Sequence, residues 1–278
     1  MYLQFPQKPE KLTRAEQSLL EFVEGSREEF LFMTIGQLAR RTGISEATIS
    51  RFVRHLGCRD FKQLKHLVME QNYPDGPVGK MAGTLLGNGP FGVTEYLRQQ
   101  QKCLEKTLQY MDQKEFERAQ EEILRAKKIL IHGKSASASM AQLLLFRLRR
   151  LGLPVQQIPS GGTEMLEGLV QAEKDDLVIL FGFSKISREG KMILQQQKTA
   201  GYHTLCFTGR LHLTDGEKAD VNLYVYRGES GEYHSMTAAA ALVDALVVAV
   251  SSKMGVTGAK YLKRIHQLKV AYGKTENI

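Results

Sequence analysis

The sequence predicts two domains of different fold class, an all-α domain at the N-terminus and an α/β domain with a doubly wound parallel sheet after it. The chain has 278 residues, which is enough for two hydrophobic cores. Up to residue 73 the apolar residues repeat at helical spacing, whereas from about residue 94 helical patterns alternate with short apolar runs. Turn-rich runs separate the two regions.

The turn-rich runs lie at residues 72–79 and 87–90 and are dense in Gly, Pro and Asn. We therefore expect an N-terminal domain over residues 1–75, a linker over 76–92 and a C-terminal domain over 93–278. An ordinary loop is the alternative to the linker, but two such runs close together favour a domain boundary.

The N-terminal region predicts four helices. Thr13 and Glu16 have capping-box spacing, so the first helix is expected to start at Thr13. Thr34 is placed to cap a second helix over 35–42, and Ser45 a third over 46–56. A fourth runs over 61–73. The third helix is expected to bury one apolar stripe, formed by Ala47, Ile49, Phe52, Val53 and Leu56.

The C-terminal region predicts strands separated by helices. The expected strands cover residues 128–132, 155–158, 176–183, 203–208 and 221–226, and the expected helices cover 94–111, 114–125, 138–151, 163–170, 189–200 and 238–254. The strands are largely apolar, which indicates a parallel sheet buried on both faces. The run Ala238 to Val250 is interrupted by Asp244 and is too short to span a bilayer. It is expected to be either a core helix or an oligomer surface.

Composition and charge exclude several classes. The net charge of +8 suits a polyanion such as nucleic acid without being specific for one. The three Cys residues are scattered without metal-ligand spacing, so no disulfide framework, metal or cofactor is expected. The first ten residues contain two prolines and no apolar core of signal-peptide length. We expect a cytoplasmic protein without a membrane partner.

The segment from Thr34 to Gly57 has the pattern of a helix-turn-helix. Ala39 is small where the two helices must cross closely, Gly43 stands at the turn, and Ile44 is placed to plug the turn into the core. From residue 40 to residue 65 there are seven Lys or Arg against two acids. The alternative is a helical hairpin whose outer face is merely solvated.

In this motif the N-terminal part of the second helix meets base edges in the major groove of DNA. The outer face of that helix carries hydroxyl, carboxylate and guanidinium groups, which read bases or bind phosphates. The Ser45-capped helix start also suits a phosphate. The residues expected to contact double-stranded operator DNA are Thr34, Ser45, Glu46, Thr48, Ser50, Arg51 and Arg54.

Two loops of small and hydroxyl residues follow predicted strands of the C-terminal region. Open α/β sheets bind ligands at the carboxyl ends of their strands, and a tight strand-to-helix turn suits a phosphate. The first loop, after residue 132, has the spacing of neither a dinucleotide fingerprint nor a Walker loop. A plain tight turn is the alternative. The candidate anion-binding residues are Gly133, Lys134, Ser135, Ser137, Ser184, Lys185 and Ser187.

The N-terminal stretch from Thr13 to Met69 resembles the helix-turn-helix domain of RpiR-type transcriptional regulators. The run GISEATISRFVRHLG at 43–57, followed by Phe61 and the Leu64-Lys65 pair, is similar to the signature of that family. The resemblance implies a regulator that binds operator DNA. We expect it to act as a homodimer or homotetramer.

The stretch from Lys128 to Met254 resembles the SIS (sugar isomerase) domain, the usual C-terminal partner in those regulators. The loops at 133–137 and 182–189 stand at the places of the family's two phosphate loops, and Thr208 and the Ala219-Asp220 pair also match. The resemblance implies a phosphorylated sugar or amino sugar as effector, in the control of carbohydrate metabolism.

This sequence departs from the family pattern at three loop positions. Ser135 replaces a glycine, Gly182 replaces a serine and Lys185 replaces a glycine. Lys185 is expected either to add an ammonium to the phosphate site or to block it. One alternative is therefore a degenerate SIS domain without an effector.

Another alternative is a phosphosugar isomerase, since the same fold carries aldose-ketose isomerases. That reaction needs a general base and a ring-opening acid, typically Glu and His. The candidates are His132, Glu164 and His234, but no spacing binds two of them together. We therefore expect a regulator rather than an enzyme.

Overall fold

The computed structural model describes residues 3–7, 9, 11–73, 76–85, 91–229 and 231–275. The chain forms two compact units. The helical unit contains Met1–Arg98 together with Gly228–Ser235, and the sheet unit contains Gln99–Arg227 together with Met236–Ile278. The chain therefore passes between the units after residues 98, 227 and 235.

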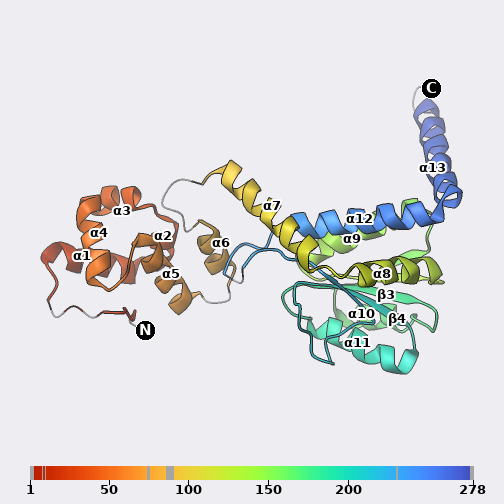
Figure 1. Ribbon diagram of the computed structural model, residues 1–278, viewed down its shortest axis with the longest axis horizontal. Helices are drawn as coiled ribbons and strands as arrows, with labels where there is room; N and C mark the ends of the chain where they lie inside the picture. Colours follow the sequence, from red (N-terminus) through yellow and green to blue (C-terminus); the bar gives the residue numbers. More distant parts are fainter. Residues whose placement is uncertain are drawn as a thin grey trace. The chain divides into compact units, whose positions relative to one another are not determined.

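The helical unit contains α1 (Arg14–Gly25), α2 (Arg27–Phe32), α3 (Ile35–Thr42), α4 (Glu46–His55), α5 (Phe61–Asn72) and α6 (Pro77–Leu85), and the first turns of α7 (Val93–Tyr110) (Figure 1). Side chains cap the helices where the sequence predicts it. Thr13 and Thr34 both form complete capping boxes, with Glu16 and Gln37. Ser45 caps α4 by accepting a hydrogen bond from the backbone N–H of Thr48.

The core of the helical unit is built from one apolar face of each helix. Ile49, Phe52 and Val53 of α4 are buried, and Leu56 follows them. Ala47, expected in the same stripe, is exposed. It lies two residues before Ile49, on the opposite side of a helix with 3.6 residues per turn, so this part of the prediction was wrong.

Part of the expected linker is a helix. Residues 77–85 form α6, and Ala82 belongs to the core of the helical unit. The glycines of this stretch allow close packing: a Cβ on Gly79 would lie 2.1 Å from the carbonyl oxygen of Tyr73, and one on Gly83 would lie 2.0 Å from that of Gly231. Gly79 and Gly83 therefore serve close approach of backbone, and the second turn-rich run, 87–90, lies outside the described residues.

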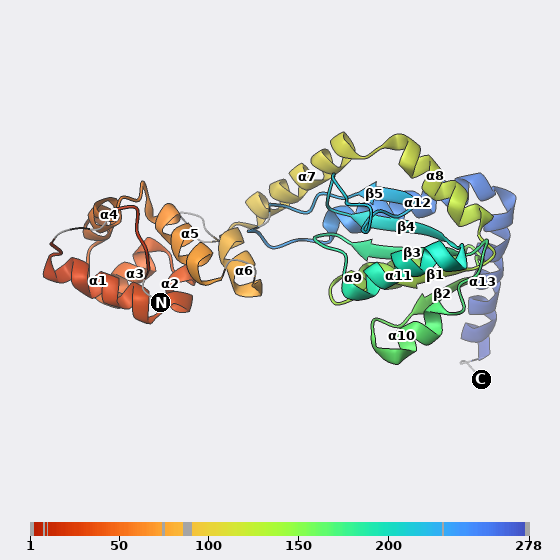
Figure 2. The same cartoon turned by 90° about the horizontal axis from the view of Figure 1, so that it is seen from below.

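The sheet unit contains five parallel strands in the order β2-β1-β3-β4-β5 (Figure 2). The strands are β1 (Ile129–His132), β2 (Val155–Ile158), β3 (Leu177–Gly182), β4 (His203–Thr208) and β5 (Val221–Tyr224). The helices of the sheet unit, besides the rest of α7, are α8 (Gln113–Arg125), α9 (Ser137–Arg150), α10 (Gly162–Leu169), α11 (Arg188–Ala200), α12 (Thr237–Met254) and α13 (Val256–Thr275). The structure thus confirms the predicted doubly wound parallel sheet.

Helices cover both faces of the sheet, with α8, α9 and α12 on one face and α10 and α11 on the other (Figure 1). Side chains alternate between the two cores along each strand. In β1, Ile129 and Ile131 belong to the core under α9 and α12, whereas Leu130 belongs to the core under α10 and α11. His132 is two residues after Leu130, so its side chain lies on the same face of the sheet, the face that α10 and α11 cover.

Helix α12 is long and apolar enough to cross a membrane by length and composition. Seven of its residues, from Ala238 to Val250, are buried, and it packs against α8 and α9. It is therefore a core helix of the sheet unit, which is one of its two predicted roles. On the following α13, the side chains of Lys260, Lys263, Arg264 and Lys269 are exposed.

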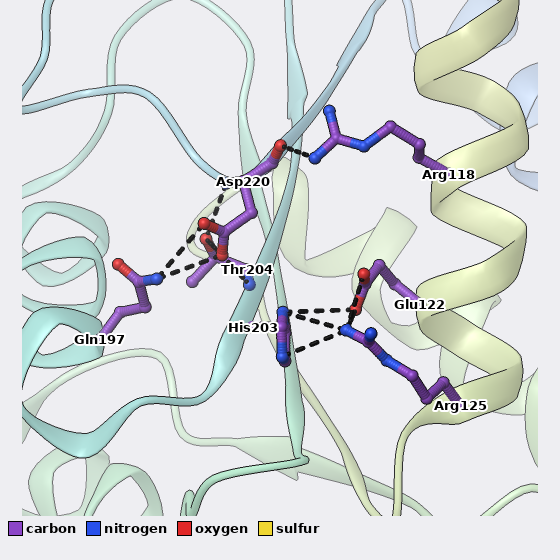
Figure 3. Close-up of polar contacts among 7 residues, drawn as sticks. All are labelled: Arg118, Glu122, Arg125, Gln197, His203, Thr204 and Asp220. Atoms are coloured by element: carbon purple, nitrogen blue, oxygen red, sulfur yellow. Dashed lines mark hydrogen bonds and ion pairs between the residues drawn. The ribbon is translucent and has the colours of Figure 1, made fainter.

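The amino ends of β4 and β5 are tied together by polar side chains (Figure 3). The carboxylate of Asp220 accepts hydrogen bonds from Thr204 and from the side-chain amide of Gln197 on α11. Arg118 of α8 donates to the carbonyl oxygen of Asp220 over 2.9 Å. Asp220, which matches the family pattern, thus fixes the edge strand at the end of the sheet opposite the carboxyl-end loops.

Candidate functional sites

The helix-turn-helix consists of α3, a turn at Gly43 and α4. Gly43 has φ +70°, in the left-handed region where glycine carries no Cβ penalty. Leu38 is buried, and Ala39 and Ile44 pack against the core beside it. The three residues that the sequence assigned to the crossing and the turn therefore take those places.

The outer face of α4 carries the side chains that were predicted to meet DNA. Ser45, Glu46, Arg51 and Arg54 are exposed, and Thr48 and Ser50 are half-buried. The Thr48 hydroxyl lies 2.9 Å from that of Ser45 and accepts a hydrogen bond from Nη2 of Arg51 over 3.2 Å. Thr34 lies at the start of α3, where its hydroxyl caps that helix, so its role in the structure is a cap.

A hollow of about 300 Å³ lies beside α4. Its lining includes Glu46, Ser50 and Arg54 of the recognition helix together with Arg59 and Asp60 before α5. Arg59 is exposed and lies 3.2 Å from Asp60. Sequence reasoning missed Arg59, although it belongs to the basic stretch between residues 40 and 65, and its exposure beside Arg54 suits a phosphate contact.

The C-terminal end of the recognition helix is fixed to α1. Nδ1 of His55 lies 2.9 Å from Oε1 of Glu16, which is also the N3 residue of the α1 capping box. Burial of Glu16 opposes ionisation, but hydrogen bonds from Thr13 and His55 outweigh it and lower the pKa of this carboxyl. The charged Glu16 of α1 therefore helps to hold α4 in its orientation on the core of the helical unit.

In the sheet unit, the topological switch point lies between β1 and β3. These strands are neighbours, but β1 continues into α9 on one face of the sheet whereas β3 leads to α11 on the other. A crevice forms where the chain diverges in this way, and open α/β sheets bind their ligands there. The two loops predicted to bind an anion follow these two strands, so the topology brings them together. We call their residues 133–137 and 183–187 the switch-point site.

The first loop keeps a glycine-like backbone at a serine. Ser135 has φ +54°, in the left-handed region, at the position where the family pattern has glycine. Gly133 is required for packing, since a Cβ there would lie 2.7 Å from the carbonyl oxygen of Ser137. The N–H groups of Ser137 and Ala138 donate to the carbonyls of Lys134 and Ser135. These two N–H groups are therefore engaged within the turn.

The second loop presents one serine to solvent and uses another as a cap. Ser184 and Lys185 are exposed, whereas the Ser187 hydroxyl caps α11 by accepting from the N–H of Gly190 over 3.0 Å. The N–H of Gly209, at the end of β4, donates to the Phe183 carbonyl over 2.8 Å. A Cβ at residue 209 would lie 2.7 Å from that oxygen, so only glycine permits this approach.

An ion pair joins the first loop to the start of α11. Nζ of Lys134 lies 2.6 Å from Oε1 of Glu189 in the first turn of α11, and this contact lowers the pKa of Glu189 to about 2. The other carboxylate oxygen, Oε2, is buried without a hydrogen-bond partner. Lys134, predicted to bind an anion directly, is therefore already paired with an acid of the protein.

His132 is the last residue of β1 and directly precedes the first loop. It is only 3% exposed, and its polar surroundings include the backbone of Pro159 and the charges of Glu189 and Lys134. Burial lowers the pKa of His132, so the ring is neutral near pH 7.

Sequence reasoning missed Arg227, which lies against the second loop. Its Nη2 donates to the Ser184 hydroxyl over 3.3 Å. Nothing in its sequence neighbourhood separates it from other surface arginines. Its position three residues after β5, at the carboxyl end of the sheet, is the one signal that was available.

A larger hollow of about 890 Å³ runs along the edge strand β5. Its lining includes Arg118, Arg210 and Asp220. These groups are paired within the protein: Arg118 with Glu115, Arg210 with Glu217, and Asp220 with Thr204. These three charged groups of the hollow are therefore already satisfied within the protein.

The three candidate isomerase residues occupy different environments. His132 is buried and neutral, Glu164 is exposed in the first turn of α10, and His234 belongs to the segment of the helical unit, where it contacts the carbonyl of Glu229. No group of three or more His, Cys, Asp or Glu among the described residues is arranged to hold a metal ion.

Two sequence families match separate parts of the chain. Residues 1–73 match the helix-turn-helix domain of the rpiR family, and residues 122–249 match the SIS domain. The first match contains the recognition helix, and the second contains both loops of the switch-point site.

Curated relatives are similar to this chain at low identity. An uncharacterized HTH-type transcriptional regulator of Caldanaerobacter subterraneus subsp. tengcongensis is 23% identical over 245 residues, which are 85% of this chain and 85% of the relative. One of Providencia stuartii is 28% identical over 171 residues, which are 59% of this chain and 58% of the relative. The match thus spans less than two thirds of the Providencia protein.

Solved structures share the fold. The Vibrio vulnificus NanR protein complexed with ManNAc-6P is 18% identical, with a TM-score of 0.59, and the match covers 95% of both chains. The sugar isomerase domain of an RpiR transcription factor from Sphaerobacter thermophilus is 21% identical, with a TM-score of 0.58, over 63% of this chain and 97% of that chain.

Proposed function

Since this chain is an RpiR-type transcriptional regulator, with an N-terminal helix-turn-helix domain and a C-terminal SIS domain, we propose that it controls genes of carbohydrate metabolism in response to a phosphosugar. The recognition helix α4 binds operator DNA. A phosphorylated sugar or amino sugar binds at the switch-point site and changes the operator affinity.

The observation that carries this proposal is the joining of two features in one chain. The helix α4 presents Ser45, Glu46, Arg51 and Arg54 outward, and the sheet unit brings two hydroxyl-bearing loops together at its switch point. The choice of a phosphosugar is supported by the Vibrio vulnificus NanR protein, which is similar in fold and was solved with ManNAc-6P.

The proposed regulator acts as a homodimer or homotetramer in the cytoplasm. Two copies of α4 then meet half-sites one helical turn of DNA apart, about 34 Å, or a multiple of it. A phosphosugar modulates binding only if its affinity differs between the DNA-bound and the DNA-free conformation.

We further propose that the chain is not an isomerase. A general base for aldose-ketose exchange must stand within hydrogen-bond reach of a sugar carbon, and His132 is 3% exposed. The remaining alternative is a degenerate SIS domain without an effector. It is favoured by the ion pair that already occupies Lys134 and by Lys185, which is exposed at the position where the family pattern has glycine.

The first test selects bound sequences from a random DNA pool with the full chain, then measures affinity for the selected DNA at several salt concentrations. We expect the selected sequence to be palindromic. We also expect the affinity to fall steeply as the salt concentration rises, because Lys and Arg side chains of the protein displace counterions from the DNA phosphates. Binding without any sequence enrichment would refute the regulator function.

The second test adds glucose 6-phosphate, glucosamine 6-phosphate, ManNAc-6P or inorganic phosphate, each against its unphosphorylated sugar where one exists. We expect at least one sugar phosphate to raise the Tm and to change operator affinity. No change with any of them contradicts phosphosugar sensing. Interconversion of an aldose and a ketose phosphate, followed by NMR, would instead support the isomerase.

A further inference from the structure

The guanidinium of Arg227 lies at the carboxyl end of the sheet, beside the Ser184 loop. The N–H of Val225 still pairs with the carbonyl of Thr208 on β4, so Arg227 follows the strand closely. Its guanidinium carbon stands 4.2 Å from the ring centroid of Phe183, and Nη2 donates to Oγ of Ser184 over 3.3 Å. The side chain therefore reaches from β5 across the end of β4 to the loop that follows β3.

This guanidinium is surrounded by neutral groups. Besides Ser184 and the Phe183 ring, its Nη1 contacts the sulfur of Met236 over 3.7 Å, and no Asp or Glu of the described residues forms an ion pair with it. Burial lowers the pKa of Arg227 to about 10. A half-buried cation held only by long contacts to neutral atoms has lost hydration without gaining a counter-charge, which favours an anion from outside.

Arg227 also stands at the base of the segment that the chain sends to the helical unit. Gly228–Ser235 belong to that unit, and Met236 is the first residue back in the sheet unit. The contact between Arg227 and Met236 therefore joins the two ends of the segment. Within the helical unit the segment is held by the N–H of Tyr233, which donates to Oγ1 of Thr84 over 2.6 Å.

We propose that Arg227 binds the phosphoryl group of the effector together with Ser184, and that this contact transmits occupancy of the switch-point site to the segment Gly228–Ser235. The proposal rests on the proposed phosphosugar-sensing function and adds to it the residue that reads the phosphate.

The chemistry follows from the guanidinium geometry. Its planar fork makes two parallel, charge-assisted hydrogen bonds to phosphate oxygens, which are shorter and stronger than the present contacts. The Ser184 hydroxyl, now an acceptor from Arg227, rotates to donate to the same phosphate. When the guanidinium moves onto the phosphate, its contact with Met236 weakens. The two ends of the segment Gly228–Ser235 are then no longer held together by this contact.

The experiment compares the full wild-type chain with Arg227→Met, Arg227→Lys and the control Arg210→Met. Methionine keeps an unbranched side chain on the Phe183 ring without the charge. Arg210 is a matched control, because it belongs to the same unit but already pairs with Glu217 over 2.6 Å. ManNAc-6P, inorganic phosphate and unphosphorylated ManNAc are titrated by calorimetry, and affinity for the selected operator is measured with and without ManNAc-6P.

We expect Arg227→Met to weaken ManNAc-6P binding roughly 10- to 100-fold and Arg227→Lys to weaken it less. The Tm of Arg227→Met without ligand should equal or exceed that of the wild type, since an uncompensated charge is removed. Operator affinity of Arg227→Met should not respond even when ManNAc-6P saturates the variant. Arg210→Met should behave as the wild type.

Wild-type affinity for ManNAc-6P in Arg227→Met would overturn the proposal and leave phosphosugar sensing intact. An operator response of wild-type size in the saturated variant would overturn the transmission step. If no probe binds the wild-type chain, the effector part of the proposed function fails together with this proposal, while DNA binding stands. If Arg227→Met does not fold, Arg227→Lys decides: affinity equal to that of Arg210→Met refutes the role.

Discussion

The carboxylate of Asp220 accepts two hydrogen bonds from Thr204, at 2.8 Å from the backbone nitrogen and 2.8 Å from Oγ1. The N–H of Asp220 in turn donates to Oγ1 of Thr204 over 3.0 Å. The two residues stand where β4 and β5 begin, so this exchange sets the position of the edge strand before its ladder starts. It lies at the end of the sheet away from the switch-point site.

Replacing Asp220 with Ala should destabilise the protein without changing phosphate binding. The variant loses a charge-assisted acceptor and leaves the buried Thr204 hydroxyl with fewer partners, a cost of about 1–2 kcal/mol after allowance for the exposure of Asp220. Urea denaturation measures the loss, and Asp215→Ala, in the same exposed loop, is the control. Equal stability of the two variants would contradict the role.

Replacing Ser135 with Gly should stabilise the first loop. Ser135 holds φ +54°, which costs a residue with a Cβ roughly 1–2 kcal/mol, whereas glycine adopts it freely but loses more entropy on folding. The net gain expected in the free energy of unfolding is up to about 1 kcal/mol. Ser137→Gly, within the helical start of α9, should instead destabilise, and a gain there would argue against the conformational explanation.

Replacing Glu189 with Gln should strengthen phosphate binding, by a few-fold to about tenfold, because Lys134 is released from its ion pair. The pKa of Glu189 is depressed to about 2, so the stabilisation from this pair is present above pH 4.5 and is lost as the pH falls through about 2. The affinity gain should therefore be constant between about pH 7 and 8 in calorimetric titrations, where the phosphate is mainly dianionic. A weaker affinity in the variant would mean that Glu189 itself contacts the ligand.

The buried Lys65 of α5 should make stability rise with pH on the alkaline side. It is 3% exposed, donates to the carbonyl of Met33 over 3.0 Å, and burial lowers its pKa from 10.5 to about 8. Between pH 8 and 10.5 the unfolded chain holds more protons than the folded one, so the free energy of unfolding increases, by about 3 kcal/mol at most.

Denaturation curves of the wild type and Lys65→Met at pH 7.5 and 9.5 test this sign. The free energy of unfolding of the wild type should increase relative to that of Lys65→Met as the pH rises. A difference that stays constant, or that moves the other way, would show that Lys65 is solvated in the native state.

Replacing both Arg51 and Arg54 with Ala should reduce operator affinity by about 2–6 kcal/mol if they bind bases, and should lower the salt slope by about one per lost phosphate contact. Arg41→Ala on α3 is the control, since that exposed arginine pairs with Glu29 over 3.2 Å. Operator binding that is unchanged in the double variant would refute α4 as the recognition helix.

The sequence predicts the elements well because their signals are local. Thr13, Thr34 and Ser45 cap the helices that their spacing indicates, and the apolar runs become the five strands of the sheet, of which β1 and β3 are buried throughout. Ala47 shows the limit, because alanine suits either face of a helix and only the packed neighbours decide. The helix α6 was concealed by glycines whose purpose is close packing, which no local pattern reveals.

The site was predictable only in part, for a similar reason. Strand order places the Ser135 and Ser184 loops together, and that order follows from alternating strands and helices. The partners of the charged groups depend on side chains far apart in sequence, such as Lys134 with Glu189 and Arg227 with Ser184. Lys134, one of the two lysines predicted to bind a phosphate, thus forms an ion pair with Glu189 at the start of α11.

The return of Gly228–Ser235 to the helical unit has a consequence for how such a protein is divided. A single cut after Arg98 does not separate the chain into two autonomous modules, because the fragment that keeps the sheet also keeps a piece of the other unit. Gly83, against which that piece lies, then loses its neighbour Gly231. A helix-turn-helix domain exchanged between such regulators by simple fusion must therefore also fit the eight residues Gly228–Ser235 that the sheet unit brings with it.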